Sequence, residues 1–274
     1  MSIRDWLLEA AALLKKAGIP SPILDSELIL STTLGYERTY LHAHSDELLS
    51  AFDLKRANEY LERRINREPL AYIFGTKEFY GREFKVAPAV LIPRPETEEM
   101  IELLKQQPPK GRLLDIGTGS GIIGITAKLE FPELSVTLSD ISPEALTIAK
   151  TNAKNLGAKS LRFVRSNLLE HWIGHTRPQS FDSIVANLPY VDENWESSPE
   201  TVYEPSLALF AEDHGLQLIK KCILQSQQVL KREGLLLLEA DRRQHTDIIL
   251  FAKRHGLKRE VVSGLIIGLR KAYP

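Results

Sequence analysis

The chain has 274 residues, of which 43% are hydrophobic and 26% are charged, and its formal net charge is −1. This composition predicts a soluble globular protein with two domains or one large one, and the near-zero charge argues against a general grip on nucleic acid. The single cysteine, Cys222, excludes an internal disulfide and a zinc site built from cysteines. Acidic residues interrupt the first apolar run, so we expect neither a signal peptide nor a membrane span, and a cytoplasmic location.

The N-terminal part of the chain has the pattern of a small helical bundle. Apolar residues recur at helical spacing over residues 6–14 and again over residues 54–65. Between these stretches, Pro22 and Gly35 are residue types that favour the start and the end of a helix. We therefore predict a helical domain over residues 1–73.

Residues 74–98 have a different texture. Aromatic and β-branched residues alternate with glycine and proline, which predicts a short β-hairpin followed by a proline-rich loop. A helix is expected to begin near Glu96, because acidic residues in the first turn suit the helix dipole.

Strands and helices alternate over residues 99–274, which favours a parallel sheet covered by helices on both faces. A hairpin-length link at Ser263–Gly264 predicts that the last two strands run antiparallel to each other. The expected strands are 112–116, 135–139, 161–165, 182–186 and 235–240, followed by 258–262 and 265–270, with helices at 121–131, 142–156 and 214–231.

A glycine-rich turn directly follows the first of these strands. The segment "DIGTGSGIIG" (115–124) joins a strand to a helix, where backbone amides face a ligand that approaches the turn. Three of its glycines have the spacing of the dinucleotide-binding fingerprint, and Asp140 ends the next strand, where an acid binds ribose hydroxyls. This motif alone leaves a dinucleotide-dependent oxidoreductase open.

Asp115 favours a different ligand. A carboxylate two residues before the first glycine suits an ammonium group better than a pyrophosphate. S-adenosylmethionine carries an ammonium group and a ribose but no phosphate, so Asp115 and Asp140 would bind its two ends. Ligands of open α/β sheets bind at the carboxyl ends of the strands, so the glycine turn, Asp140 and Asn187 should meet in one crevice.

The fourth predicted strand ends in "NLPY", residues 187–190. An amide nitrogen is a poor nucleophile, and an enzyme can help it by accepting hydrogen bonds from both of its N–H groups. The Asn187 side-chain oxygen and the Leu188 carbonyl are two such acceptors, Pro189 stiffens the turn, and Tyr190 offers a flat face. The pattern therefore predicts methylation of a planar nitrogen, and a plain turn is its alternative.

Together these motifs resemble the methyltransferases that carry an (Asn/Asp)-Pro-Pro-(Tyr/Phe) motif and methylate planar nitrogens. Within that class the chain resembles the HemK/PrmC family, the peptide chain release factor glutamine N(5)-methyltransferases. The segments that carry the resemblance are "REPLAYIFGTKEFYGREFKV" (67–86), "VLIPRPETEEMI" (90–101), the glycine turn, "VANLPYV" (185–191) and "EPSLALFAEDHGL" (204–216).

The resemblance implies an α/β fold, with a Rossmann-like S-adenosylmethionine-dependent methyltransferase domain over residues 99–274 built on a seven-stranded sheet. It implies that the helical domain recognises the substrate protein and that a β-hairpin linker follows it. The implied cofactor is S-adenosyl-L-methionine, released as S-adenosyl-L-homocysteine, and the implied substrate is the glutamine of the Gly-Gly-Gln loop in release factors. We expect a monomer with no stable nucleic-acid partner and no membrane association.

The resemblance also assigns site residues. The glutamine amide would be bound by Asn187, Leu188, Pro189 and Tyr190. The cofactor's methionine end would lie on the glycine turn, its ribose at the end of the next strand, its adenine near residues 167–168, and a closing loop would come from the "PRPETE" segment. The implied set is Asp115, Gly117, Thr118, Gly119, Ser120, Gly121, Asp140, Ile141, Asn167, Leu168, Asn187, Arg94 and Glu96.

Three positions depart from the family pattern, and the final hairpin "VVSGLIIGLRK" (261–271) also lacks the family's usual acidic start, a change expected to affect the periphery of the fold. Leu188 stands where the family usually has proline, but a backbone carbonyl is retained, so we expect activity to survive. Asn167 replaces the usual aspartate, which puts the affinity for the adenine in question. Ala240 replaces the glycine that commonly follows Glu239, a change expected to affect the periphery of the fold.

Several alternatives stay open. A nucleic-acid exocyclic-amine methyltransferase is the second candidate, and a dinucleotide-dependent oxidoreductase is the third. We expect no metal site, because the spacing of His171 and His175 falls in a loop-like context. The polar loop over residues 191–203 is either a substrate lid or a plain connector.

Overall fold

The computed structural model describes residues 1–174, 180–196 and 198–272. The chain divides into two compact units, which are described separately. Unit 1 comprises Met1–Gly75 and Ser198–Tyr203, and unit 2 comprises Thr76–Ser197 and Glu204–Pro274. The chain therefore contributes to unit 1 twice, the second time with part of the loop that follows "NLPY".

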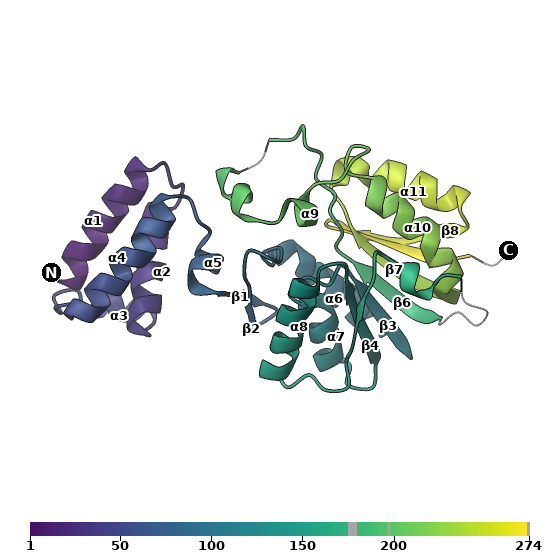
Figure 1. Cartoon of the computed structure of the whole chain (residues 1–274), viewed down its shortest axis with the longest axis horizontal. Helices are drawn as coiled ribbons and strands as arrows, with labels where there is room; N and C mark the ends of the chain where they lie inside the picture. Colours follow the sequence, from purple (N-terminus) through teal and green to yellow (C-terminus); the bar gives the residue numbers. More distant parts are fainter. Residues whose placement is uncertain (175–179, 197, 273–274) are drawn as a thin grey trace. The chain divides into compact units, whose positions relative to one another are not determined.

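The N-terminal part of unit 1 is a helical bundle, drawn in purple and blue in Figure 1, and this confirms the helical N-terminal region predicted from the sequence. Ser2 caps the first helix, where its hydroxyl accepts a hydrogen bond from the Asp5 backbone N–H at 3.1 Å. Trp6, Leu30 and Leu61 come from three helices and are buried together. The elements are α1 (Ile3–Lys16), α2 (Pro22–Leu34), α3 (Arg38–Ala43), α4 (Ala51–Ile65), α5 (Leu70–Phe74) and the 3-10 turn η3 (Pro199–Tyr203).

A buried ion pair lies inside unit 1. Arg64 Nε donates to Asp25 Oδ2 at 2.7 Å, and both side chains are almost fully buried. Arg64 and Arg67 also approach Glu200, at 3.4 and 3.3 Å, so the returning segment is bound to the bundle by charge. Whether residues 191–203 act as a lid or as a connector stays a prediction, and Ser197 lies outside the described residues.

Unit 2 contains a mixed sheet, and among the described residues it has seven strands in the order β5-β4-β3-β6-β7-β9-β8. Strands β3 to β7 run parallel, and β8 and β9 are antiparallel to each other, as the short link at Ser263–Gly264 predicted. Strand β9 is also antiparallel to its other neighbour, β7. The strands are β3 (Arg112–Ile116), β4 (Ser135–Asp140), β5 (Arg162–Arg165), β6 (Phe181–Ala186), β7 (Leu230–Glu239), β8 (Leu257–Ser263) and β9 (Ile266–Lys271).

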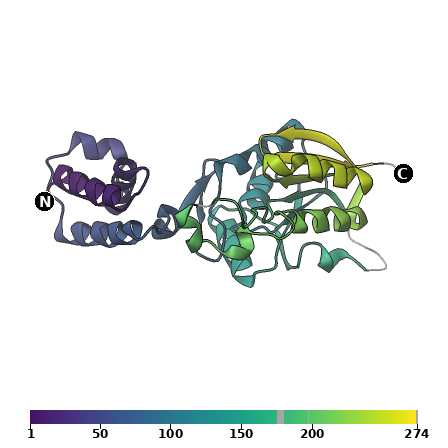
Figure 2. The ribbon, with the colours of Figure 1, turned by 90° about the horizontal axis from the view of Figure 1, so that it is seen from above.

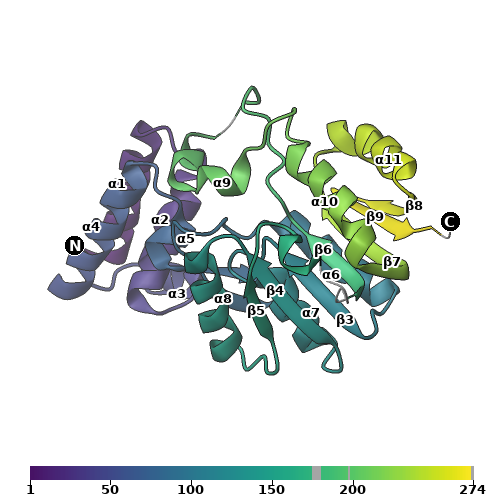
Figure 3. The ribbon, with the colours of Figure 1, turned by 45° about the vertical axis from the view of Figure 1, so that its right-hand side comes forward.

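Helices cover both faces of this sheet (Figure 3). The apolar run in β7 is continuous because this strand is buried on both faces of the sheet. Leu236 and Leu238 pack on the face covered by α10 and α11. Leu235 and Leu237 pack on the opposite face, which α6, α7 and α8 cover. The Rossmann-like α/β fold is therefore confirmed. The helices are α6 (Glu98–Gln106), α7 (Ile122–Glu130), α8 (Pro143–Asn155), α9 (Ser206–Leu209), α10 (Gln217–Val229) and α11 (His245–Arg254), with 3-10 turns η1 (Pro95–Thr97), η2 (Glu170–Trp172) and η4 (Arg242–Gln244).

The predicted hairpin is present as β1 (Thr76–Phe79) and β2 (Arg82–Lys85), which pair antiparallel. At the other end of the chain, β8 and β9 lie beside α11 (Figure 2, yellow).

One strand boundary differs from the sequence prediction by more than one residue. Strand β7 begins at Leu230 instead of residue 235, because Leu230 and Phe181 are both buried and pair with each other. A register shift and the left-handed backbone of Glu233, with φ of 59°, absorb the residues in between. Local propensity does not reveal such a tertiary pairing.

Candidate active site

The glycine turn lies between β3 and α7. Gly121 caps the helix with φ of 88°, and a Cβ there would lie 2.5 Å from Ile125 Cδ1, so only glycine fits. Gly119 has φ of 53°, and nothing lies within 4 Å of where its Cβ would be. The turn therefore presents bare backbone to an open space, as a turn that receives a ligand must. Ser120 is buried, and its carbonyl accepts a hydrogen bond from Asn152 Nδ2 at 2.8 Å.

Asp115 lies at the tip of β3 and is only 1% exposed. Its Oδ2 accepts hydrogen bonds from the Thr118 hydroxyl at 2.5 Å and the Gly124 N–H at 2.8 Å. Its Oδ1 has no partner among the described residues. Burial raises the pKa of this carboxyl to about 7, and the nearby Asp140 charge acts in the same direction. A buried oxygen without a partner is costly, and a ligand with an ammonium group would satisfy it.

Asp140 ends the neighbouring strand and faces the same turn. Its Oδ2 accepts from the Gly119 N–H and its Oδ1 from the Ser142 N–H, both at 2.9 Å. Burial raises the pKa of Asp140, and these backbone hydrogen bonds oppose the rise. Ile141, the next residue, is 54% exposed. Because each carboxylate oxygen keeps a second lone pair, Asp140 is equipped to accept from a pair of hydroxyls.

Asn167 and Leu168 follow β5 at this edge of the sheet. The Ser166 N–H donates to the Asp140 carbonyl at 3.0 Å, which places this segment beside the end of β4. Asn167 Nδ2 donates to Glu170 Oε1 at 3.1 Å, so the amide oxygen is the group left to face a ligand. Leu168 is buried and adopts a left-handed backbone with φ of 50°. Such a conformation is unfavourable for leucine and is held by its packing.

The "NLPY" segment meets the glycine turn at the end of β6. Ile116 and Ala186 are paired in the parallel register of β3 and β6, so the residues that follow each strand are neighbours. A Cβ on Gly117 would lie 3.2 Å from Leu188 Cδ2 and 3.9 Å from the Asn187 carbonyl oxygen. The structure thus brings the glycine turn, Asp140 and Asn187 to one edge of the sheet.

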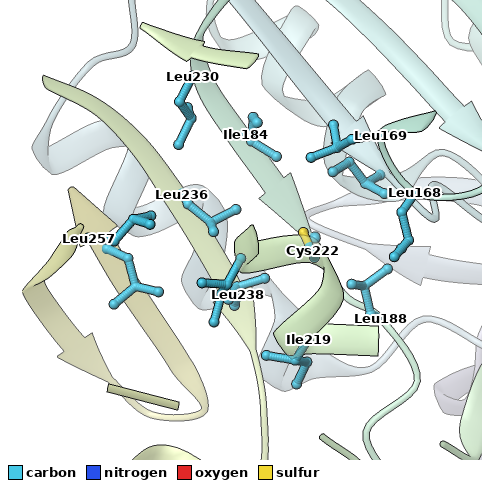
Figure 4. Packing of buried hydrophobic residues seen from close by; sticks show 14 of the residues in the cluster. Leu168, Leu169, Ile184, Leu188, Ile219, Cys222, Leu230, Leu236, Leu238 and Leu257 are labelled. Carbon is cyan, nitrogen blue, oxygen red and sulfur yellow. The ribbon is translucent and has the colours of Figure 1, made fainter. Parts of the chain in front are cut away.

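The Leu188 side chain points into the core, as Figure 4 shows, where it lies near Leu168, Ile219 and Cys222. Its backbone carbonyl oxygen receives no hydrogen bond from any of the described residues. Cys222 is fully buried, and burial raises the pKa of its thiol to about 12, which leaves it a core residue rather than a nucleophile.

The side chains of Asn187 and Tyr190 form hydrogen bonds with Thr97 and Glu239. Asn187 Nδ2 donates to Thr97 Oγ1 at 3.2 Å, and Thr97 Oγ1 donates to Glu239 Oε2 at 2.7 Å. The Tyr190 hydroxyl donates to Glu239 Oε1 at 3.1 Å. Burial raises the pKa of Glu239, and burial together with the Glu239 charge raises the pKa of Tyr190.

The backbone after the motif is also pinned. Gln244 Nε2 donates to the Tyr190 carbonyl and to the His214 carbonyl, both at 2.8 Å. A Cβ on Gly215 would lie 2.0 Å from the Tyr190 carbonyl oxygen, so the "EDHGL" turn can approach only as glycine. Tyr190 itself is half-buried against the apolar cluster. These contacts fix where the motif ends relative to the sheet.

Comparisons with known proteins agree with this geometry. Residues 5–75 match the family model described as the PrmC N-terminal domain, and residues 95–204 match the methyltransferase small domain. The chain is 41% identical over 245 residues to a release factor glutamine methyltransferase of Koribacter versatilis, covering 87% of this chain and 86% of the relative. It is 35% identical to one of Deinococcus radiodurans, covering 95% of this chain and 94% of the relative.

The chain belongs to the family of release factor glutamine methyltransferases.

Solved structures support the fold of this family member. A ribosomal protein L11 methylase of Lactobacillus delbrueckii is similar with a TM-score of 0.51 and 22% identity, covering 72% of this chain and 90% of that one. A methyltransferase of Pyrococcus furiosus is similar with a TM-score of 0.52 and 18% identity, covering 79% and 100% of the two chains. Both are methyltransferases, which agrees with the Rossmann-like fold.

Two residues expected at the cofactor have other surroundings in this methyltransferase. Arg94 Nη2 forms an ion pair with Glu204 Oε1 at 2.5 Å, and Glu204 Oε2 also accepts from the Ile92 N–H at 3.1 Å. Glu96 is exposed, and its charge raises the pKa of Glu239. Contact of Arg94 and Glu96 with the cofactor stays a prediction.

Sequence reasoning missed Thr97 and Glu239. Thr97 lies inside the "PRPETE" segment that carried the resemblance, and Glu239 is the acidic end of an otherwise apolar run. The sequence prediction gave Glu239 no role, whereas its carboxylate accepts hydrogen bonds from Thr97 and Tyr190. A charged residue directly after "LLLL", at the carboxyl end of a predicted parallel strand, is the signal that could have found it.

Metal and membrane features can be assessed only where the structure describes the chain. There, no three side chains of His, Cys, Asp or Glu are grouped so that they could hold a metal ion. His175 lies outside the described residues. No helix among those residues is long and apolar enough to span a membrane.

Proposed function

We propose that this protein transfers a methyl group from S-adenosylmethionine to the side-chain amide nitrogen of the glutamine in the Gly-Gly-Gln loop of peptide chain release factors. Its membership of the release factor glutamine methyltransferase family supports this activity. The observation that carries the proposal is a pair of unoccupied acceptors: no donor among the described residues reaches Asn187 Oδ1 or the Leu188 carbonyl oxygen.

These two acceptors suit the chemistry of an amide. The cofactor supplies a methyl group that is already activated on sulfonium, so the chain has to improve and align the nucleophile. Hydrogen bonds from both amide N–H groups to Asn187 and Leu188 stabilise the positive charge that develops on nitrogen. The same contacts align the nitrogen with the methyl group, and such alignment accelerates a reaction strongly, since effective molarities can reach on the order of 10⁵ M. The methylated nitrogen is strongly acidic and loses its proton to solvent without a dedicated base.

The residues on the cofactor side fit S-adenosylmethionine. The unpartnered Oδ1 of Asp115 matches its ammonium group, and the two oxygens of Asp140 match its ribose hydroxyls. The open backbone at Gly119 leaves room for the methionine part, with Thr118 bracing Asp115. A pyrophosphate would bring negative charge toward Asp115, which disfavours a dinucleotide.

We propose that the helical bundle recognises the release factor. We also propose that the protein is a monomer and acts in the cytoplasm. It carries a groove of about 240 Å³ between α1 and α4. The groove is lined by Met1, Trp6, Glu9, Ala10, Leu13, Asn58, Leu61, Glu62 and Ile65.

The decisive experiment uses labelled S-adenosylmethionine and a release factor. We expect label on the wild-type release factor and none on a variant in which the loop glutamine is alanine. Equal label on both would refute the substrate assignment. Label on RNA or DNA offered in the same reaction would establish the nucleic-acid alternative, and stabilisation by NAD but not by S-adenosylmethionine would establish the oxidoreductase.

A further inference from the structure

A chain of hydrogen bonds leads from Asn187 into the core of unit 2. The Asn187 amide donates to Thr97 at 3.2 Å, and Thr97 donates to Glu239 at 2.7 Å. Thr97 is 0% exposed and Glu239 is 1% exposed, so water does not compete for these groups. The three residues come from the "PRPETE" segment, the end of β6 and the end of β7, which meet only in the folded protein.

The direction of each hydrogen bond in this chain follows from its last member, the carboxylate of Glu239. An ionised carboxylate can only accept, so it takes the single hydroxyl hydrogen of Thr97. Thr97 then has only lone pairs to offer Asn187, and Asn187 must present its NH₂ group to them. The side-chain oxygen of Asn187 is thereby turned away from Thr97.

This orientation is the one that catalysis requires. The two ends of an asparagine amide have nearly the same shape, so packing alone distinguishes them poorly. A glutamine amide approaching Asn187 offers N–H donors, which only the Asn187 oxygen can accept. If the NH₂ group faced the substrate, the two amides would present donors to each other.

We propose that Glu239 is a positioning residue, which through Thr97 fixes the Asn187 amide with its oxygen toward the acceptor nitrogen. The inference deepens the proposed function and rests on it. The same carboxylate receives the Tyr190 hydroxyl at 3.1 Å, so one buried group sets both the first and the last residue of "NLPY". Glu239 touches neither substrate nor cofactor in this role.

The cost of burying Glu239 supports a role beyond packing. Its partners are hydroxyl and amide donors from Thr97, Tyr190 and Asn187 rather than a cation, and burial raises its pKa. The exposed Glu96 raises the pKa further, while Arg94 and Asp241 act on the neighbouring Tyr190. A buried carboxylate of this kind is rarely kept for stability alone, because an apolar residue would be cheaper.

The first test compares two variants of Thr97. T97V removes the Thr97 hydroxyl that accepts from the Asn187 NH₂ group and leaves that group only its interaction with Glu239, so we expect kcat on a release factor to fall about tenfold. T97S keeps the hydroxyl and should stay within about twofold of wild type. KM for the release factor and the Kd for S-adenosylmethionine should change little, because the contact acts on the reacting amide.

A matched control removes another buried threonine hydroxyl. Thr126 lies in α7, is 0% exposed, and its hydroxyl has no partner among the described residues. T126V should therefore keep wild-type kcat. If T97V and T126V behave alike and both fold, the positioning role of Thr97 is wrong.

The dependence of kcat on pH tests whether Glu239 positions Asn187 or only stabilises the fold. Protonated Glu239 can donate to Thr97, which then donates to the Asn187 oxygen and reverses the amide. At saturating cofactor we therefore expect the kcat of wild type to fall on the acid side as Glu239 takes up its proton. E239Q carries an NH₂ donor beside its Oε1 acceptor and so fixes the direction of the Thr97 hydrogen bond less strictly, and we expect kcat to fall about threefold at neutral pH and the acid limb to be lost. An unchanged acid limb in E239Q would overturn the role of Glu239.

One measurement needs no substrate and so separates this inference from the proposed function. The side-chain NH₂ signals of Asn187, identified in nitrogen-15 spectra by their absence in N187D, should exchange slowly with solvent in wild type and T97S. In T97V they should exchange at least tenfold faster. Absence of methylation by the wild type together with this pattern would refute the proposed substrate alone. Equal exchange in T97V and wild type would refute the orientation mechanism alone.

Discussion

The two sides of the candidate site are built in different ways. On the cofactor side, Asp115 is held by residues three and nine positions away in the sequence, and Asp140 by Ser142 and the adjacent glycine turn. On the acceptor side, Asn187 depends on Thr97, which is 90 positions away. The first side is a local backbone structure, whereas the second exists only when several segments have packed together.

The acceptor side should fail most completely when its central residue is removed. N187A deletes one of the two acceptors that we propose for the glutamine amide, and we expect kcat to fall about 100- to 1,000-fold, as for the loss of one oxyanion-hole group. Isothermal titration should show an unchanged Kd for S-adenosylmethionine. A comparable loss of cofactor affinity would mean that Asn187 belongs to the cofactor side.

The cofactor side should respond in binding rather than in turnover. D140A removes the carboxylate that we propose binds the ribose hydroxyls, and we expect the Kd for S-adenosylmethionine to rise about 30- to 100-fold. At saturating cofactor, kcat should stay within about threefold of wild type. A fall in kcat with an unchanged Kd would contradict the assignment of Asp140 to the ribose.

The proposed role of Asp115 implies that cofactor binding depends on pH. Its pKa is raised to about 7, and the ionised form binds an ammonium group, so affinity should rise with pH through this value. Between pH 6 and pH 7.5 the ionised fraction, and hence the affinity, increases about eightfold for such a carboxyl. Titrations of wild type and D115N check this, and D115N should bind weakly with no pH dependence in that window.

The same pKa has the opposite effect on the free protein. A carboxyl whose folded pKa lies above its unfolded value of 3.8 holds its proton more tightly in the folded state. The free energy of unfolding without cofactor should therefore decrease as the pH rises from about 4 to about 7. D115N should abolish this part of the decrease in denaturant titrations, and a persistent decrease of the same size would assign it to other groups.

The sequence predicted the local structure around the glycine turn better than the long-range contacts of Asn187 for a physical reason. Strand tips, positive-φ glycines and the acid at the end of the next strand are set by local periodicity and turn chemistry, so Asp115, Gly119 and Asp140 could be found by spacing. The parallel sheet and the antiparallel final strand followed from the same patterns. Thr97 has no local signature, and Glu239 has only that of a charged residue after an apolar run, because the partners of both residues are defined by tertiary packing.

A substitution of Leu188 should have the smallest effect of those considered, because its side chain and its backbone carbonyl have separate roles. Its side chain packs in the core near Leu168, while the role proposed for it depends only on its backbone carbonyl. L188P keeps the carbonyl and removes part of the buried side chain, so we expect kcat within about twofold of wild type. The lost packing costs about 1–2 kcal/mol, which should lower Tm by about 2–4 °C in a thermal melt.

The direction of any deviation would be informative. A tenfold loss of kcat in L188P at an unchanged Tm would mean that the packed leucine sets the position of its carbonyl. The acceptor side would then depend on core packing at both of its hydrogen-bond acceptors, through Thr97 for Asn187 and through the apolar cluster for Leu188. A wild-type kcat in L188P would instead mean that the backbone turn after β6 is enough to fix the Leu188 carbonyl. Of the two acceptors, only Asn187 would then depend on long-range contacts.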